Sequence, residues 1–159
     1  MSRLRRAVQT GRRVFLRRPA ARDRDAYLRL RRRSAAFLRP WEPAPTRART
    51  EIVRGPSQSA FLGYWIGAPF ARQGYMTEAL QLGLRHAFRI LSLHRVEANI
   101  MPANRASIAL VKRAGFHREG YSARYLKIAG HWADHERWAL TVEDWRALPG
   151  GGRGRQRSS

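Results

Sequence analysis

The residues of this chain best suited to chemistry lie in a short turn that precedes an amphipathic helix. The turn runs Arg72-Gln73-Gly74-Tyr75-Met76-Thr77, and an apolar segment comes shortly before it. The first backbone N–H groups of a helix have no partner within the helix and lie at the positive end of its dipole, so they can bind phosphate. Gly74 permits a close approach of the backbone, and Arg72 adds a charge that pairs with phosphate. On this segment alone, a single glycine at a helix start is more typical of an ordinary tight turn.

A second group of polar side chains, His131, Asp134 and His135, lies beside a predicted hairpin turn. Imidazole and carboxylate groups at this spacing point to a metal site or a proton relay. Their position by a hairpin, without a third strong ligand, favours exposed surface side chains instead. The chain has no cysteine, which excludes thiolate ligands, disulfides and cysteine nucleophiles. We therefore predict no metal site.

The elements that must position these residues alternate between strands and helices. Residues 60–67 (AFLGYWIG) predict a buried strand, residues 77–91 a helix with one apolar side, and residues 94–100 another strand. Asn104 predicts the start of a further helix, which Gly115 closes. The other predicted elements are a strand at 14–16, a helix from Asp23 or Asp25 to about Pro40, a loop over 40–59, and extended segments from Phe116 to Val142 that turn within 127–132. This order predicts a mixed α/β domain.

The domain organisation follows from length and composition. The 159 residues suggest one domain with a modest core. Residues 1–13 are basic and are predicted to form a flexible extension. Residues 14–146 form the single predicted domain, and residues 147–159, which end in PGGGRGRQRSS, are predicted to be a disordered tail.

The charge of the chain is strongly positive. There are 32 basic and 11 acidic residues, a net charge of +21, and only Lys112 and Lys127 are lysines. Such a surface attracts polyanions: RNA, anionic lipid headgroups or a phosphate-rich cofactor. Biased codon usage and a solvated surface explain the arginines equally well. No apolar run approaches the ~20 residues of a membrane span, so we expect no span and a cytoplasmic protein.

The wider order of motifs resembles the GNAT N-acetyltransferases. The motifs are Tyr64-Trp65-Ile66-Gly67, then Arg72 to Leu80, Asn104-Arg105-Ala106-Ser107 and Arg113-Ala114-Gly115-Phe116. Within that family the chain looks most like the ribosomal-protein-alanine N-acetyltransferases. Three further stretches support this narrower resemblance: Arg39-Pro40-Trp41-Glu42-Pro43, Glu119-Gly120-Tyr121-Ser122, and Gly130 to His135. The resemblance is strong over residues 51–146 and thinner over 14–43.

The resemblance implies a GNAT-like mixed sheet flanked by helices and acetyl-CoA as co-substrate, with no metal. The acceptor amine would attack the thioester directly, without a covalent enzyme intermediate. Ser107 lies where some relatives place the acid that protonates the departing thiolate, and Tyr121 is a second candidate for that proton. The position of a glutamate base in some relatives corresponds to Leu126, so no base is identified. The residues implied to hold coenzyme A are Ile66, Gly67, Arg72, Gln73, Gly74, Tyr75, Met76, Thr77 and Asn104.

One departure from the family concerns the N-terminal half. Relatives place a helix and two central strands between the Trp-Glu-Pro segment and the Gly-Tyr-Trp strand, which needs on the order of 35–40 residues. Here only the segment from Ala44 to Arg54 bridges the two. We therefore expect an internal deletion, a fold truncated in its N-terminal half and short between 44 and 60, and an exposed edge on the strand at 60–67.

Three functional hypotheses remain open at this point. The first is an acetyl-CoA-dependent N-acetyltransferase for a protein N-terminal amine, such as an alanine of a ribosomal protein. The second is an inactive remnant that binds acetyl-CoA without turnover. The third is a basic protein that contacts RNA or the ribosome through its arginine-rich surface.

Overall fold

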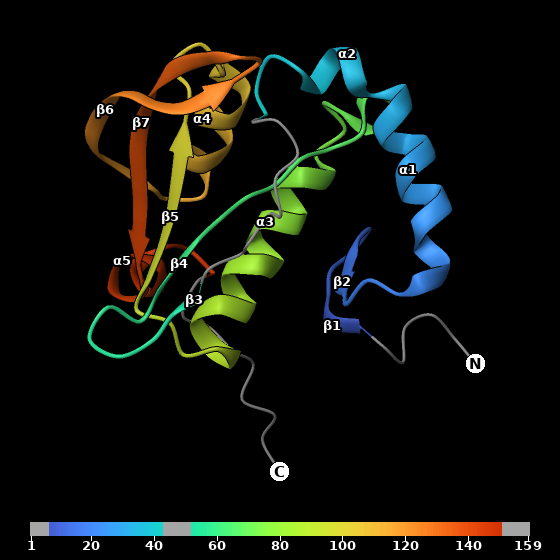
Figure 1. Ribbon diagram of the computed structural model, residues 1–159. Coiled ribbons are helices and arrows are strands. Elements are labelled where there is room, and N and C mark those ends of the chain that lie inside the picture. The colour runs from blue at the N-terminus through green and yellow to red at the C-terminus, as the bar shows by residue number, and fades with distance from the viewer. Residues whose placement is uncertain (1–6, 43–51, 151–159) are drawn as a thin grey trace.

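The β-structure consists of a five-stranded mixed sheet and a separate two-stranded hairpin, as seen in a computed structural model (Figure 1). The structure describes residues 7–42 and 52–150. The large sheet has the order β3-β4-β5-β7-β6. Its strands are β3 (Ile52–Val53), β4 (Ser59–Phe61), β5 (Arg95–Ile100), β6 (His117–Ile128) and β7 (His131–Thr141). β4 and β5 are parallel and the other neighbours are antiparallel, so the predicted mixed α/β fold is confirmed.

Two helices cover the apolar face of the large sheet. α3 (Tyr75–Arg85) continues into a π-helical segment, His86–Ile90, and connects β4 to β5, while α4 (Arg105–Arg113) connects β5 to β6. In β5 every second residue is buried, as the predicted alternation requires. The core joins side chains of the sheet, α3, α4 and the short α5 (Val142–Ala147): Leu80, Leu84, Phe88, Val96, Ala98, Ile100, Ile108, Val111, Trp138, Leu140 and Trp145.

The N-terminal part of the chain docks on α3, which corrects one prediction. β1 (Ala7–Thr10) and β2 (Phe15–Arg17) form a hairpin, followed by the 3-10 turn Ala21–Asp23, α1 (Arg24–Arg33) and α2 (Ala35–Leu38). The backbone N–H groups of Arg13 and Val14 donate to the Glu78 carboxylate at 2.8 and 3.4 Å. Residues 7–13 are therefore an ordered hairpin rather than a flexible extension. Residues 1–6 lie outside the described part of the chain.

The strand predicted over residues 60–67 is much shorter than expected. Pairing with β5 covers β4 and ends with the bond from the Leu62 N–H to the Glu97 carbonyl at 2.7 Å. Beyond Leu62 the chain leaves the sheet, and Trp65 packs edge-on against Tyr27 of α1 at 5.5 Å between ring centroids. The Arg31 guanidinium lies 4.8 Å from the centroid of the Trp65 ring. Trp65, one of the aromatic residues that predicted a strand, thus contacts α1 instead.

β3 covers the outer edge of β4 at Ser59 and Ala60, so the predicted exposed edge is wrong at this end of the segment. Ile52 and Val53 pair with Ala60 and Ser59, within a segment predicted to be a loop. Residues 43–51, most of the segment predicted to be short, lie outside the described residues. The described chain passes from α2 to β3 without a further strand before the gap.

The C-terminal half follows the prediction closely, except at its end. The turn at Ala129 and Gly130 joins β6 to β7 as predicted. Leu148, predicted to belong to a disordered tail, packs against the core instead. Residues 151–159 lie outside the described residues. No helix in the described ranges is both long and apolar enough to cross a membrane.

Candidate active site

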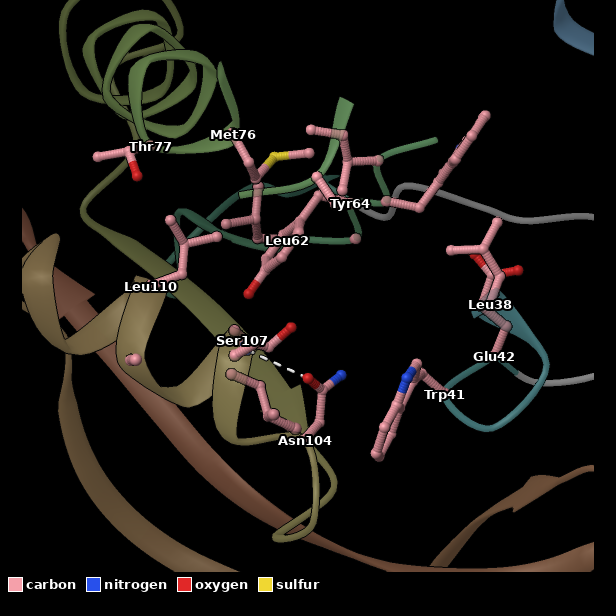
Figure 2. Close-up of a pocket in the computed structure, with 18 of the residues that line it drawn as sticks. Leu38, Trp41, Glu42, Leu62, Tyr64, Met76, Thr77, Asn104, Ser107 and Leu110 are labelled. Atoms are coloured by element: carbon pink, nitrogen blue, oxygen red, sulfur yellow. Dashed lines mark hydrogen bonds between the residues drawn. The ribbon is translucent and has the colours of Figure 1, made fainter. Parts of the chain in front are cut away.

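A cleft of about 1970 Å³ opens where β4 and β5 diverge. Figure 2 shows one wall formed by the N-terminal ends of α3 and α4 and, across from it, a wall formed by α2 and the residues that follow it. Leu38, Trp41 and Glu42 belong to this second wall. Seven of the residues predicted for the site line the cleft: Ile66, Arg72, Gly74, Met76, Thr77, Asn104 and Ser107. The fold thus brings the two helix starts, 30 residues apart in the chain, to one cavity.

The turn before α3 has the backbone that phosphate binding requires. Gly74 has φ +79° and Arg72 has φ +61°, so two of three consecutive residues are left-handed. This conformation is why a glycine is needed at position 74. No described residue accepts a hydrogen bond from the N–H groups of Tyr75, Met76 or Thr77, and no side chain caps this helix. These donors are therefore available to an anion.

Arg13, from the N-terminal hairpin, lies over this turn and was not predicted. Its guanidinium lies 4.9 Å from the centroid of the Tyr75 ring, and its Nε lies 3.5 Å from Glu78 Oε2. A Cβ added to Gly74 would come within 2.8 Å of Arg13 Nη2. The hydrogen bonds from the hairpin backbone hold the pKa of Glu78 below its usual value of 4.5, so the carboxylate stays charged. No local pattern could have revealed this contact, because it joins residues 65 positions apart.

The start of α4 confirms the predicted cap. Asn104 Oδ1 accepts a hydrogen bond from the Ser107 N–H at 3.1 Å. The Asn104 amide nitrogen keeps its donors for a ligand, because no described residue accepts from it. Ser107 presents its hydroxyl to the same cleft one turn into the helix (Figure 2).

Tyr64 is the buried polar group nearest this helix start. Its hydroxyl is buried and has no hydrogen-bond partner of good geometry among the described residues. It points toward the Ser107 hydroxyl (Figure 2). Burial raises the pKa of Tyr64 above its ordinary 10.0, and the nearby Ser107 hydroxyl offsets this only in part. Tyr64 therefore keeps its proton at neutral pH. The alternation of Leu62, Tyr64 and Ile66 along one extended segment could have indicated this position.

Four residues predicted for the site do not line the cleft. Gly67 is buried, and a Cβ there would meet Leu30 at 2.5 Å, while the Gln73 side chain donates to the Pro69 carbonyl at 2.8 Å. Tyr75 packs its ring against Arg13. Tyr121 is 50% exposed on β6 and donates to the Asp134 carboxylate, which raises the pKa of Tyr121. A tyrosine held this way outside the cleft is not positioned to protonate a thiolate, and we do not assign it that role.

His135 was predicted to be exposed, and this is wrong. His135 is only 3% exposed and lines the cleft. His131, by contrast, is exposed on the same hairpin. No group of three or more His, Cys, Asp or Glu side chains within residues 7–42 and 52–150 could hold a metal ion.

These features define a class of protein. Two parallel strands diverge beside a helix start with a glycine turn, and the cleft between them is suited to a long, phosphate-bearing ligand. A family model for the acetyltransferase (GNAT) domain matches residues 50–117 of the chain. The matched range contains β3 to α4, and so includes the two helix starts that form the first wall of the cleft.

Curated relatives support the same assignment. The chain is 44% identical over 96 residues to the [ribosomal protein uS5]-alanine N-acetyltransferase of Escherichia coli, covering 60% of this chain and 50% of that protein. It is 43% identical over 94 residues to the probable N-acetyltransferase YjcK of Bacillus subtilis, covering 59% and 52%. The chain thus spans about half the length of the curated relatives it matches.

Solved structures extend the similarity to most of the chain. Mycobacterium smegmatis RimJ, solved in complex with CoA-disulfide, superposes with a TM-score of 0.77 at 29% identity and 82% coverage of each chain. The ribosomal-protein-S5-alanine acetyltransferase of Vibrio fischeri superposes with a TM-score of 0.80 at 22% identity, covering 89% of this chain and 100% of that one. At that identity the second comparison shows the fold, and it confirms the GNAT-like sheet expected from the motifs.

Proposed function

We propose that this protein is an acetyl-CoA-dependent N-acetyltransferase that acts on a protein N-terminal amine, such as an alanine of a ribosomal protein, in the cytoplasm. The observation that carries the proposal is the unpaired helix start at Tyr75 to Thr77 in the same cleft as Asn104 and Ser107. The acceptor class rests on the ribosomal-protein-alanine enzyme at 44% identity.

The chain's residues have separate parts in the proposed reaction. The N–H groups of the segment Arg72 to Thr77 bind the pyrophosphate of coenzyme A, so Gln73 and Tyr75 contribute through the backbone rather than through their side chains. The divergent segment ending at Ile66 orients the pantetheine arm, and the Asn104 amide donates to it. Catalysis then depends mainly on positioning and on polarisation of the thioester carbonyl by a backbone N–H.

The leaving group needs one proton, and the cleft offers a route for it. The amine nitrogen bonds to the carbonyl carbon and loses one proton to solvent, the carbon–sulfur bond breaks, and the thiolate takes the hydroxyl proton of Ser107. Tyr64, whose hydroxyl faces Ser107, replaces that proton (Figure 2). Because Tyr64 is protonated at neutral pH, the pair can act together where a serine alone would be a weak acid.

A substitution at the turn tests the cofactor site. Gly74→Asp places a carboxylate among the phosphate donors, and we expect calorimetry to show loss of coenzyme A binding. Gly130→Asp is a matched control, since Gly130 also has a positive φ, +90°, and nothing lies within 4 Å of its added Cβ. Absence of coenzyme A binding by the wild-type protein would refute the proposal.

An inactive acetyl-CoA-binding remnant is the second candidate. The observation in its favour is the volume of the cleft, about 1970 Å³, which is roughly twice the upper range of small-molecule sites. Such an opening is what an incomplete acceptor wall would leave. Acetylation of an alanine-starting peptide, followed by mass spectrometry, rules this candidate out. RNA contact through the arginine-rich surface rests on charge alone, and steeply salt-dependent RNA binding that acetyl-CoA leaves unchanged would favour it.

A further inference from the structure

The face of the sheet that α3 and α4 do not cover carries a buried histidine at the edge of the cleft. In the register of β5 and β7, Ala98 pairs with Trp138 and Ile100 with Glu136, and this series faces the core. Asn99 pairs with Arg137 on the other face, and His135 is the next residue of β7 on that face. His135 thus lies beside the end of β5, from which the chain leads to α4.

The imidazole of His135 is fixed in one tautomer by its own strand. Its Nδ1 lies 3.0 Å from the Ala133 carbonyl oxygen, which can only accept, so Nδ1 carries the hydrogen. Nε2 of the neutral ring then has a free lone pair, and no described residue donates to it. The ring is held edge-on by Tyr125 at 5.7 Å between centroids, and the Tyr125 hydroxyl accepts from Asn99 Nδ2 at 3.4 Å.

A base is what the proposed reaction still lacks. An N-terminal amine has a pKa of about 7.7–8.0, so most of it is protonated and not nucleophilic at neutral pH. Leu126 occupies the position where some relatives have a glutamate, and it cannot accept a proton. Asn99, Tyr125 and His135 all line the cleft, and of these only the histidine has a lone pair suited to the task.

We propose that His135 is the general base of the acetyl transfer, accepting at Nε2 a proton from the acceptor ammonium on the face of the sheet that α3 and α4 do not cover. This inference rests on the proposed function. The proton passes from the acceptor nitrogen to Nε2, the neutral amine attacks the thioester, and the thiolate is protonated from the opposite side through Ser107. The attacking nitrogen gives its second proton to solvent as the amide forms, Tyr64 regains a proton from solvent, and His135 releases its own, which restores the starting state.

Other charged groups near His135 must be considered in any pH profile. Asp134, next to it in sequence, is bound by the Tyr121 hydroxyl and the Arg124 N–H, which keep its pKa below 3.8. Glu136 and Arg137 follow it on β7. Across the cleft, Glu42 is paired with Arg31 at 2.6 and 2.8 Å. Tyr125 is the titratable group packed directly on the ring.

A tautomer measurement tests the assignment without any acceptor. In long-range ¹⁵N–¹H spectra of the full-length protein, we expect the neutral ring of His135 to carry its hydrogen on Nδ1. A neutral ring protonated on Nε2 would overturn the inference, because Nε2 could then only donate. The His135→Gln spectrum assigns the signal.

Kinetics with acetyl-CoA and an alanine-starting hexapeptide test the role itself. We expect His135→Gln to lower kcat/KM by up to roughly 10-fold at pH 7, because only about a tenth of an amine of this pKa is neutral at that pH, with unchanged coenzyme A affinity. The loss should shrink toward pH 9, where the amine is neutral without help, whereas a purely structural defect would persist at every pH. His131→Gln is the matched control, because His131 is exposed on the same hairpin. Equal rates for wild type and His135→Gln overturn this inference alone, while absence of peptide acetylation by the wild type counts against the proposed function.

Discussion

Substitution of Arg13 tests whether the turn Arg72 to Thr77 binds the pyrophosphate of coenzyme A. Its guanidinium lies over Gly74, at the start of a helix whose first N–H groups are unpaired. If coenzyme A places its pyrophosphate there, Arg13 adds a positive charge to the backbone donors. We predict that Arg13→Ala weakens coenzyme A binding.

The expected loss of coenzyme A affinity follows from the exposure of the Arg13 side chain and from the contacts that remain in Arg13→Ala. The Arg13 side chain is 43% exposed, so solvent screens its charge, and a contact of this kind is worth about 1 kcal/mol, or roughly a fivefold rise in Kd. The hairpin should stay docked, because Glu78 is held by the backbone N–H groups of Arg13 and Val14, which the substitution retains. The thermal midpoint should therefore change little.

Calorimetric titration with coenzyme A and with pantetheine separates the effect from a general defect. Pantetheine lacks the pyrophosphate, so its affinity should be the same in both proteins. Arg18→Ala is the matched control, since Arg18 is an exposed arginine of the same N-terminal segment that does not line the cleft. If Arg13→Ala and Arg18→Ala bind coenzyme A equally well, the reasoning is wrong.

Three further predictions concern the supports of the site. Asn104→Ala removes the cap of α4 and should cost about 1 kcal/mol, seen as a lower thermal midpoint together with weaker coenzyme A binding; an unchanged midpoint would contradict the capping role. Ser34 is 0% exposed and its Oγ accepts from the Ala68 N–H at 3.0 Å, so Ser34→Ala should cost about 1–3 kcal/mol in urea unfolding, whereas a cost near zero would show that this N–H finds another partner. The pKa of Asp23 is lowered chiefly by Arg17 and that of Glu78 chiefly by the Arg13 N–H, so the stability they add is complete above their ordinary values of 3.8 and 4.5 and is lost as pH falls through the lower folded values. The urea unfolding midpoint should therefore be constant from pH 7 to about 5 and decrease at lower pH. If the midpoint of a Glu78→Gln variant decreases equally steeply in acid, Glu78 does not have the part assigned to it.

The helices and strands predicted best are those that the local sequence within the element specifies. β5 was predicted because Val96, Ala98 and Ile100 alternate with polar residues, and the structure buries these three. The helix start at Asn104 was predicted because a side-chain cap is a local signal. α5 was missed, since six residues give no periodicity, although Thr141 followed by Asp144 is a cap signature that could have indicated it.

The errors come from contacts between distant parts of the chain. An apolar segment shows that residues 60–67 are partly buried, but not that Trp65 meets Tyr27 rather than a neighbouring strand. In the hairpin at 7–17 only residues 14–16 form an apolar run, and the docking of the hairpin on α3 depends on Glu78. For His135, alternation along β7 gives two faces, and only the tertiary structure shows that the second face is enclosed at this point.

Because of the same long-range contacts, the conformation of the turn Arg72 to Thr77 depends on the N-terminal region. The segment from Gly67 to Glu78 is held at its start by Ser34, which accepts from Ala68, and by Leu30, which fills the space beside Gly67. It is held at its end by the hairpin on Glu78. A left-handed backbone at Arg72 costs free energy, and such strain persists only where surrounding contacts fix it. The turn is thus encoded locally by its glycine, but its ordered form depends on residues 7–34, and any ligand bound to the turn must stabilise that docked arrangement.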